Sequence, residues 1–179
     1  GGIEIETGPR RQRYSKKVRS GVVISNGGLL QTVEHMLGPE VVGADYLKHL
    51  KQLRSSYPCY LMHIGIKGIS TETLEQAQGY YWNDWNPDLM GCKDLTFKIF
   101  VPTLFEPAMA PPDGHVVVIQ KVLDMDYEAV EDWAFHKAEI DAFILKNLNQ
   151  VIPGFTDHIV VNMSASAQTS YRFTLNNQG

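Results

Sequence analysis

Cysteine is scarce in this chain, since Cys59 and Cys92 are its only two cysteines among 179 residues. Two thiols are too few for a disulfide framework or for a four-thiolate zinc site, so a reducing compartment fits the composition best. No apolar run approaches the roughly 20 residues that a membrane-spanning helix needs, and no signal peptide with a charged start and an apolar middle opens the chain. The sequence therefore predicts a cytoplasmic protein.

Several catalytic and cofactor-binding motifs are also missing. No Gly-x-Gly-x-x-Gly follows a strand pattern, so the chain lacks the fingerprint that seats a dinucleotide pyrophosphate on a helix N-terminus. It has no Walker loop, no Gly-x-Ser-x-Gly elbow and no His-Glu-x-x-His pair. Hydrolase and phosphoryl-transfer functions therefore have no motif to support them.

Basic residues are fewer than acidic residues overall, but six of them are concentrated in one segment. The formal net charge is −4, which disfavours a nucleic-acid-binding protein because such a protein needs a basic surface to neutralise phosphates. Two interpretations of the basic cluster remain open: a solvated hairpin or edge strand protected by its charge, or a contact with an anionic membrane surface. The cluster comprises Arg10, Arg11, Arg13, Lys16, Lys17 and Arg19.

The order of hydrophobic patterns indicates the fold class. Of the residues, 44% are hydrophobic and 20% are charged, which is ordinary for a globular chain. Strands and helices mix without a regular β-α alternation, so the sequence predicts an α+β fold with a mixed, largely antiparallel sheet and helices on one face. Strands are expected at 1–7, 18–25, 59–66, 79–82, 95–101, 115–123 and 158–162, and helices at 29–37, at 44–53 and between Asp126 and Pro153.

Helix ends are predicted from capping residues. Asn26 is the expected cap of the helix at 29–37, and Gly38-Pro39 is its expected stop. Asp126 is the expected cap of the long helix, which Pro153-Gly154 should end.

The segment 95–122 is the most informative part of the chain. It predicts two apolar strands joined by a loop that carries four of the nine prolines, Pro102, Pro107, Pro111 and Pro112. Each proline fixes φ and removes a backbone donor, so this loop should form a stiff lip that leads into a turn at Asp113-Gly114. Alternate residues of each strand share one face, and the face that helices do not cover must meet solvent, a ligand or another domain.

A few side chains are candidates for chemistry. Cys59 and His63 are four residues apart in a predicted strand and should share a face, which allows a thiol with its base or two metal ligands. An inert core thiol and an incidental histidine are the preferred interpretation, because no second ligand pair at metal spacing accompanies them. His115 is either a proton donor near a ligand or a histidine with an ordinary surface hydrogen bond. His136 is expected on the polar side of the long helix.

An aromatic cluster precedes the proline-rich segment. It either lines a pocket for a flat apolar ligand or packs a half-buried strand. Its members are Tyr80, Tyr81, Trp82 and Trp85.

Three segments resemble the phytoene desaturase, carotenoid isomerase and retinol saturase group of FAD-dependent flavoproteins. Val22 to Gly28 is similar to the family's strand that leaves the FAD domain. Phe97 to Val122 resembles the family's strand pair with its Pro-Ser-x-x-Asp-Pro-x-x-Ala-Pro-x-Gly stretch, with Thr103 and Glu106 in place of serine and aspartate. Ile140 to Val161 resembles the family's long helix with a Pro-Gly end. Ala167-Gln168-Thr169 stands where the family tends to show a Thr-Pro step.

The resemblance implies the substrate-binding domain of a larger FAD-dependent oxidoreductase that acts on an isoprenoid, carotenoid or retinoid. It implies a junction with the FAD domain at 1–27, a substrate domain at 28–163 and a polar tail at 164–179 that leads back to the FAD domain. Ser25, Asn26 and Gly27 would lie near the cofactor, which the fragment alone is not expected to hold. The basic stretch Arg10–Arg19 would help the parent enzyme reach a membrane. The implied substrate-binding residues are Tyr81, Phe97, Ile99, Phe105, Val116, Val118 and Gln120.

No residue of the chain is assigned a catalytic step. Two other functions remain open. One is a stand-alone module that binds an apolar ligand or a partner protein without catalysis, with the uncovered face closed by the chain itself or by a dimer. The other is a small hydrolase that uses Cys59 or a serine, which requires a base within about 3 Å of the nucleophile.

Overall fold

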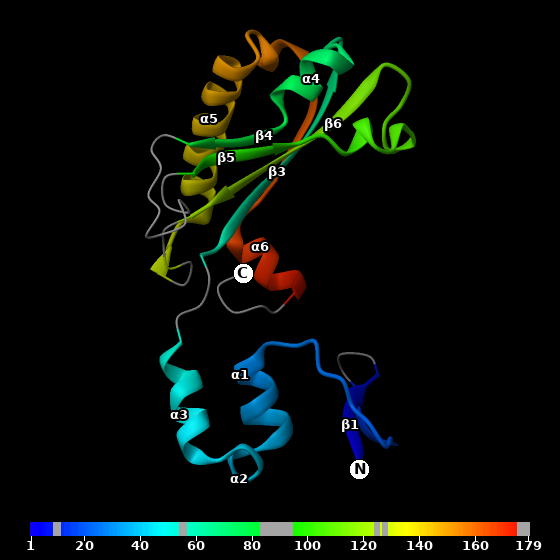
Figure 1. The fold of residues 1–179 in the computed structure, drawn as a ribbon, viewed down its shortest axis with the longest axis vertical. Coiled ribbons are helices and arrows are strands. Elements are labelled where there is room, and N and C mark those ends of the chain that lie inside the picture. The colour runs from blue at the N-terminus through cyan, green and yellow to red at the C-terminus, as the bar shows by residue number, and fades with distance from the viewer. Residues whose placement is uncertain (9–11, 54–56, 83–94, 124–125, 127–128, 175–179) are drawn as a thin grey trace. The chain divides into compact units, whose positions relative to one another are not determined.

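The computed structural model describes residues 1–8, 12–53, 57–82, 95–123, 126 and 129–174. The chain divides into two compact units, Gly1–Leu53 and Arg54–Gly179. The division therefore falls after Leu53 and not after Gly27, where the resemblance places the end of a junction. Each unit is drawn in Figure 1 and is described by itself.

The first unit consists of a β-hairpin and short helices. Strands β1 (Gly2–Thr7) and β2 (Tyr14–Arg19) pair antiparallel, with Ile3 opposite Val18 and Ile5 opposite Lys16. The helical elements are α1 (Leu29–Gln31), the π-helical segment η1 (Thr32–Leu37), α2 (Pro39–Val42) and α3 (Ala44–Gln52). The predicted helices at 29–37 and 44–53 are thus present, although the first is partly π-helical.

The predicted strand at 18–25 is wrong. Strand β2 ends at Arg19, and Val22 and Ile24 are 77% and 90% exposed. The Ser20 side chain donates to the Val22 carbonyl and accepts from the Val22 N–H, so a local turn takes up backbone groups that a strand would use. A β-branched run forms a buried strand only where other elements cover it, and the described part of this unit provides no such cover.

Asn26 does not cap the first helix. The Gly28 carbonyl accepts from the Thr32 N–H at 2.8 Å, which makes Gly28 the residue at the helix start. Gly38 ends η1 with a φ of 86°, as the Gly-Pro pair predicted.

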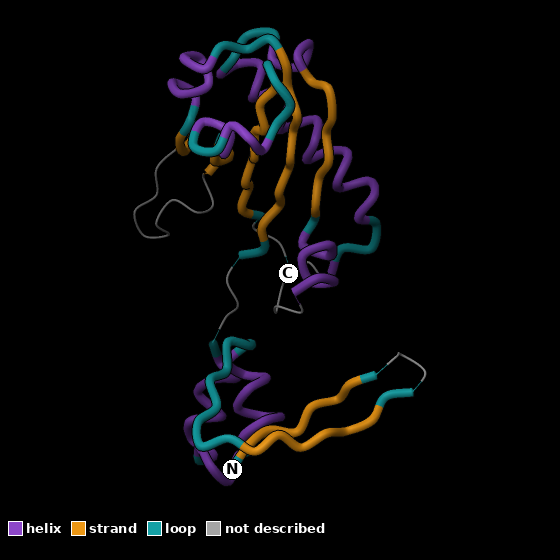
Figure 2. The backbone as a smooth tube through the Cα atoms, turned by 90° about the vertical axis from the view of Figure 1, so that its right-hand side faces the viewer, coloured by secondary structure: helices purple, strands orange, loops and turns teal. Residues whose placement is uncertain are grey.

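The second unit contains a five-stranded sheet in the order β4-β5-β6-β3-β7, in which every described pairing is antiparallel. With its helices this sheet gives an α+β fold, as predicted, and Figure 2 shows its strands side by side. The strands are β3 (Cys59–Lys67), β4 (Gly79–Trp82), β5 (Leu95–Phe100), β6 (Gly114–Val122) and β7 (Ile159–Ala165). The α-helices are α4 (Thr71–Ala77), α5 (Trp133–Val151) and α6 (Ala167–Thr174).

The long helix α5 starts later than predicted. Its cap is Asp132, whose carboxylate accepts from the Phe135 N–H at 3.0 Å, and not Asp126. Both aspartates suit a cap by residue type, and the backbone places only Asp132 before the first helical turn. At the other end Gly154 adopts the left-handed region with a φ of 77°, so the predicted Pro-Gly stop is confirmed.

The segment after β7 is more structured than the polar tail that was predicted. Residues 167–174 form α6, and its start is marked by a hydrogen bond from the Thr169 N–H to the Ser166 hydroxyl at 3.4 Å. Ala167 is fully buried, which ties this helix to the core.

The core of the second unit lies between one face of the sheet and α5. Every second residue of β3 is buried here, and Ile144 and Leu148 of α5 are fully buried in the same cluster. The sheet side chains in this core are Tyr60, Met62, Ile64, Ile66, Phe97, Ile99, Val117 and Ile119. Among the described helices, none is long and apolar enough to cross a membrane.

Candidate functional site: the open face of the sheet

The face of the sheet opposite the core is the candidate functional site, and we call it the open face. Successive residues of a strand point to opposite faces, so the neighbours of the core residues lie here. Cross-strand pairs confirm the set, because Phe100 is paired with Val118 and Lys98 with Gln120. The described open-face residues include Cys59, Leu61, His63, Gly65, Tyr80, Lys98, Phe100, Val116, Val118, Gln120, Val122, Val161, Met163 and Ala165.

The open face is apolar and exposed over much of its area. Phe100 is 40% exposed, Val161 is 51% exposed and Met163 is 66% exposed. Monomeric proteins rarely leave large contiguous apolar patches in water unless a ligand or partner covers them. The described residues therefore present a surface suited to binding an apolar molecule or another protein domain.

Aromatic rings give this face a defined shape at one side. The rings of Phe100 and Phe105 stack with centroids 5.9 Å apart, and those of Tyr80 and Trp82 stack at 6.3 Å. The Lys98 ammonium lies 5.1 Å from the Tyr80 ring centroid and 6.0 Å from that of Phe100. Such rings bury large apolar areas, and the lysine cation is positioned by their faces.

A glycine near the centre of the face makes room for a neighbouring side chain. Gly65 lies on β3 opposite Val116 and Val161 of the two neighbouring strands. A Cβ atom at this position would lie 2.6 Å from a methyl carbon of Val161, which is too close for any side chain without a shift. The Val161 side chain therefore packs over the β3 backbone at Gly65, in space that a larger residue at this position would need.

The thiol and imidazole of the open face do not form a catalytic pair. Cys59 and His63 share this face, as predicted, but four residues of strand separate them by about 13 Å. The Cys59 sulfur accepts instead from the Gln120 amide at 3.3 Å. Among the described residues no group of three or more metal-ligating side chains occurs. These observations favour the inert interpretation of both residues over a hydrolase.

The seven implied substrate-binding residues are divided between the two faces. Val116, Val118 and Gln120 lie on the open face, and the exposed Phe105 stacks on its rim. The other three, Tyr81, Phe97 and Ile99, lie on the opposite face and belong to the core or pack against it.

The core position of the second group follows from strand register. Ile99 is paired with Ile119 and Tyr81 with Phe97, which places these side chains against α5. Phe97 is fully buried, and the Tyr81 hydroxyl donates to the Ala77 carbonyl at 2.7 Å. They cannot contact a ligand on the open face. The alternate residues Lys98 and Phe100 take that place. Sequence reasoning missed them because the strand pattern by itself does not say which of its two faces the helices cover.

Ser25, Asn26 and Gly27, the expected cofactor-proximal residues, form an exposed loop in the first unit. The Gly27 N–H donates to the Ser25 hydroxyl at 3.4 Å, and that hydroxyl shares a 2.7 Å hydrogen bond with Thr32. A pyrophosphate site needs several unpaired N–H groups at a helix start. The Ser25 hydroxyl and the Gly27 N–H are engaged within the loop, so they do not fit a site that offers them to the FAD pyrophosphate.

The described basic residues lie on the exposed hairpin of β1 and β2. All six residues of β2 are exposed, including Lys16, Lys17 and Arg19, and Arg13 pairs with Glu6 at 3.2 Å. The hairpin is thus present and these residues are exposed on it, while the choice between a solvated hairpin and a membrane contact stays a prediction. Arg10, Arg11, Trp85 and Cys92 lie outside the described residues.

Two further ionisable groups face away from the open face. Burial lowers the pKa of Lys121, whose ammonium donates to the Thr96 carbonyl at 3.2 Å and lies 4.9 Å from the Phe143 ring centroid. His136 lies on α5 and contacts Glu139 at 3.5 Å, on the polar side of the helix as predicted. Neither group reaches the open face.

The chain matches no known protein-family model, and no curated protein matches its sequence. Its function is therefore inferred from its own geometry. The open face can bind an apolar body and exclude water, while its few polar groups are a cation, an amide and a solvent-exposed imidazole.

Proposed function

We propose that this chain is the substrate-binding portion of an FAD-dependent oxidoreductase that acts on an apolar isoprenoid, carotenoid or retinoid. The observation that carries the proposal is the exposed apolar face of a sheet whose other face is covered by α5. Burial of an extended hydrocarbon on such a face contributes about 0.8 kcal/mol per CH₂ group. The face is long enough along β3 and β6, each of nine residues, to contact many such groups.

The sequence resemblance supplies the redox part of the proposal. FAD would accept or donate the hydride or electrons when a C=C bond is formed, isomerised or saturated. As the resemblance implies, the cofactor would be held by the FAD domain of the parent enzyme. The residues of the open face would bind the hydrocarbon, align it and keep water from the reacting bonds.

Binding of an apolar substrate is tested with the 179-residue chain and all-trans-retinol, whose fluorescence rises on transfer from water to an apolar site. Phe100→Glu places a charge on the open face, whereas Phe135→Glu places the same charge on exposed α5. We expect Phe100→Glu to weaken binding at least tenfold, because a carboxylate would be desolvated against the hydrocarbon. The Phe135→Glu control should bind like the unaltered chain, and circular dichroism checks that both variants fold.

Equal retinol binding by the two variants would contradict the proposed site.

The redox part of the proposal has its own test in the encoding gene. We expect the reading frame to include a strand followed by Gly-x-Gly-x-x-Gly, and the protein expressed from the whole frame to carry flavin absorbance. A reading frame without that motif would contradict the proposed oxidoreductase function and would favour a stand-alone module that binds an apolar ligand or a partner protein.

A further inference from the structure

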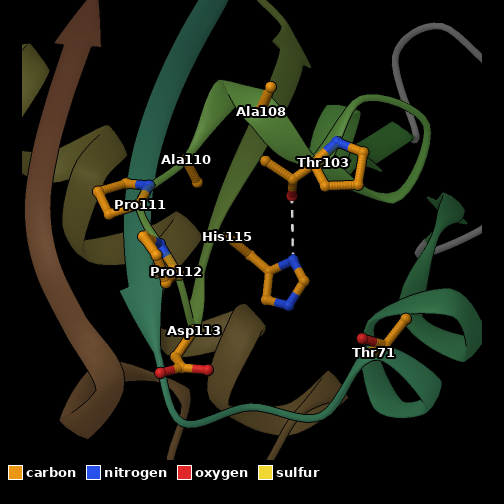
Figure 3. Close-up of a pocket in the computed structure, with 10 residues that line it drawn as sticks. Thr71, Thr103, Ala108, Ala110, Pro111, Pro112, Asp113 and His115 are labelled. Carbon is orange, nitrogen blue, oxygen red and sulfur yellow. Dashed lines mark hydrogen bonds between the residues drawn. The ribbon is translucent and has the colours of Figure 1, made fainter.

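A pocket of about 530 Å³ lies at the end of the sheet where β6 begins (Figure 3). This volume falls in the range typical of small-molecule sites, roughly 300 to 1,000 Å³. Its walls come from the proline-rich loop, the first residues of β6 and the start of α4. His115 is paired with the buried Ile66, so it lies on the core side of the sheet and the pocket is separate from the open face.

The proline-rich wall is held by its own backbone hydrogen bonds. The loop folds into two 3₁₀ turns, η3 (Pro102–Leu104) and η4 (Pro107–Met109), followed by a turn in which the Gly114 N–H donates to the Pro111 carbonyl at 3.0 Å. Prolines fix φ at these positions, and the backbone polar groups are paired locally. The wall is therefore preorganised in the absence of a ligand, which lowers the entropic cost of binding.

Hydrogen-bond counting assigns the protons of His115. The buried Thr103 hydroxyl accepts from the Val116 N–H at 3.3 Å and lies 3.1 Å from Nδ1 of His115. If Nδ1 were the donor, the Thr103 hydroxyl proton would have no acceptor among the described residues. With the Thr103 hydroxyl as donor to Nδ1, the buried hydroxyl and Nδ1 are both paired, and the neutral ring carries its proton on Nε2 of the half-buried imidazole, where the pocket can supply the acceptor.

The protonated nitrogen is available to a ligand. Figure 3 shows the His115 ring directed into the space between the prolines and Thr71 of α4, with Nδ1 bonded to Thr103. No other described residue is hydrogen-bonded to this ring. Pro107, Pro111 and Pro112 supply apolar surface, and the Asp113 carboxylate at the pocket disfavours an anion.

We propose that this pocket binds a neutral small molecule whose apolar body contacts the proline wall and whose carbonyl or hydroxyl oxygen accepts a hydrogen bond from Nε2 of His115. The site goes beyond the proposed function, because it uses the other side of the sheet and requires neither FAD nor an extended hydrocarbon. Thr103 is a positioning residue here, since it acts only through the ring.

Two probes of equal shape test the proposal by NMR on the ¹⁵N-labelled 179-residue chain. Cyclohexanone carries the acceptor oxygen, and methylenecyclohexane replaces it with a CH₂ group. We expect cyclohexanone to shift the amide resonances of Thr71, Gly114 and Val116 and to bind about fivefold more tightly than methylenecyclohexane, the effect of one net hydrogen bond. Equal affinities, or no shift of these resonances by cyclohexanone, would overturn the proposal.

Variants and ring spectra separate a specific site from general apolar binding. His115→Phe keeps a flat ring and should weaken cyclohexanone binding about fivefold, whereas His136→Phe on α5 should leave it unchanged. The ¹⁵N ring spectrum of the unaltered chain should show Nε2 protonated and Nδ1 bare, which needs no variant to fold. A spectrum with the proton on Nδ1, or cyclohexanecarboxylate binding as tightly as cyclohexanone, would contradict the assigned ligand class.

Discussion

The Tyr60 hydroxyl donates a 2.6 Å hydrogen bond to Oδ1 of Asp141, which joins the central strand β3 to the long helix α5. The second carboxylate oxygen of Asp141 accepts from the Ser164 hydroxyl of β7 at 2.9 Å. One side chain of the helix therefore contacts two neighbouring strands. Since Tyr60 is fully buried, this contact fixes how α5 lies on the core face and leaves the opposite face open.

Removal of the Tyr60 hydroxyl should destabilise the second unit. Tyr60→Phe keeps the ring but deletes a hydrogen bond to a carboxylate, which should lower the free energy of unfolding by about 1.5 to 3 kcal/mol. Tyr80→Phe removes a hydroxyl from an exposed ring and should change stability by less than about 0.5 kcal/mol. Urea denaturation measures the unfolding midpoint of each variant, and equal midpoints would contradict the structural role of the contact between Tyr60 and Asp141.

The same contact predicts a loss of stability at high pH. Burial, and then the hydrogen bond to Asp141, raise the pKa of Tyr60 well above its usual value of 10.0. The folded state thus holds this proton more tightly than the unfolded state, so the contribution is complete below pH 10.0 and is lost as the pH rises above it. Unfolding midpoints from pH 8 to 11 should fall more steeply for the unaltered chain than for Tyr60→Phe.

The turn that forms one wall of the His115 pocket should tolerate few residues at its third position. Asp113 has a φ of 61°, a left-handed conformation that costs a β-branched residue about 1 to 2 kcal/mol. Asp113→Val should therefore lower the thermal midpoint, whereas Asp113→Asn should leave it nearly unchanged, because asparagine adopts this conformation readily. Differential scanning calorimetry measures both, and a stable valine variant would show that the turn can change its conformation.

The end of α5 depends on a side-chain bridge. Oδ1 of Asn149 accepts from the Thr156 N–H at 3.1 Å, and its amide nitrogen donates to the Thr156 hydroxyl at 3.1 Å. Asn149→Ala should cost about 1 to 2 kcal/mol by leaving the turn at Gly154 without these bonds. Asn147→Ala is the matched control, since its exposed amide bonds only the Phe143 carbonyl of the same helix and alanine favours helix.

The exposed hairpin should bind anionic membranes if the basic cluster has the membrane role that the sequence allows. Each lysine near an acidic surface contributes about 1 kcal/mol, so Lys16→Glu with Lys17→Glu should weaken binding to phosphatidylserine vesicles at least tenfold. Lys67→Glu with Lys146→Glu makes the same change in net charge within the second unit and should have a smaller effect. Vesicle sedimentation measures both, and equal losses would indicate only a general effect of charge.

Local sequence patterns were sufficient for most of the second unit. The alternation along β3, the β-branched run of β6 and the glycine after Pro153 predict their elements because each depends on residues within a few positions. The proline loop and its turn were predicted for the same reason. The prediction at 18–25 failed because a β-branched run is a strand only when distant segments cover it, which the run itself does not encode.

The sequence by itself determined that this chain has a mixed α+β fold with a proline-stiffened strand connection, since periodicity and restricted φ angles act locally. Only the tertiary structure decided which face of the sheet is open. Strand register assigns Phe97 to the core and Phe100 to the open face, and the contact of Tyr60 with Asp141 spans 81 residues. The tertiary structure also places the Thr103 hydroxyl beside the His115 ring, because such pairings depend on the packing of the whole unit.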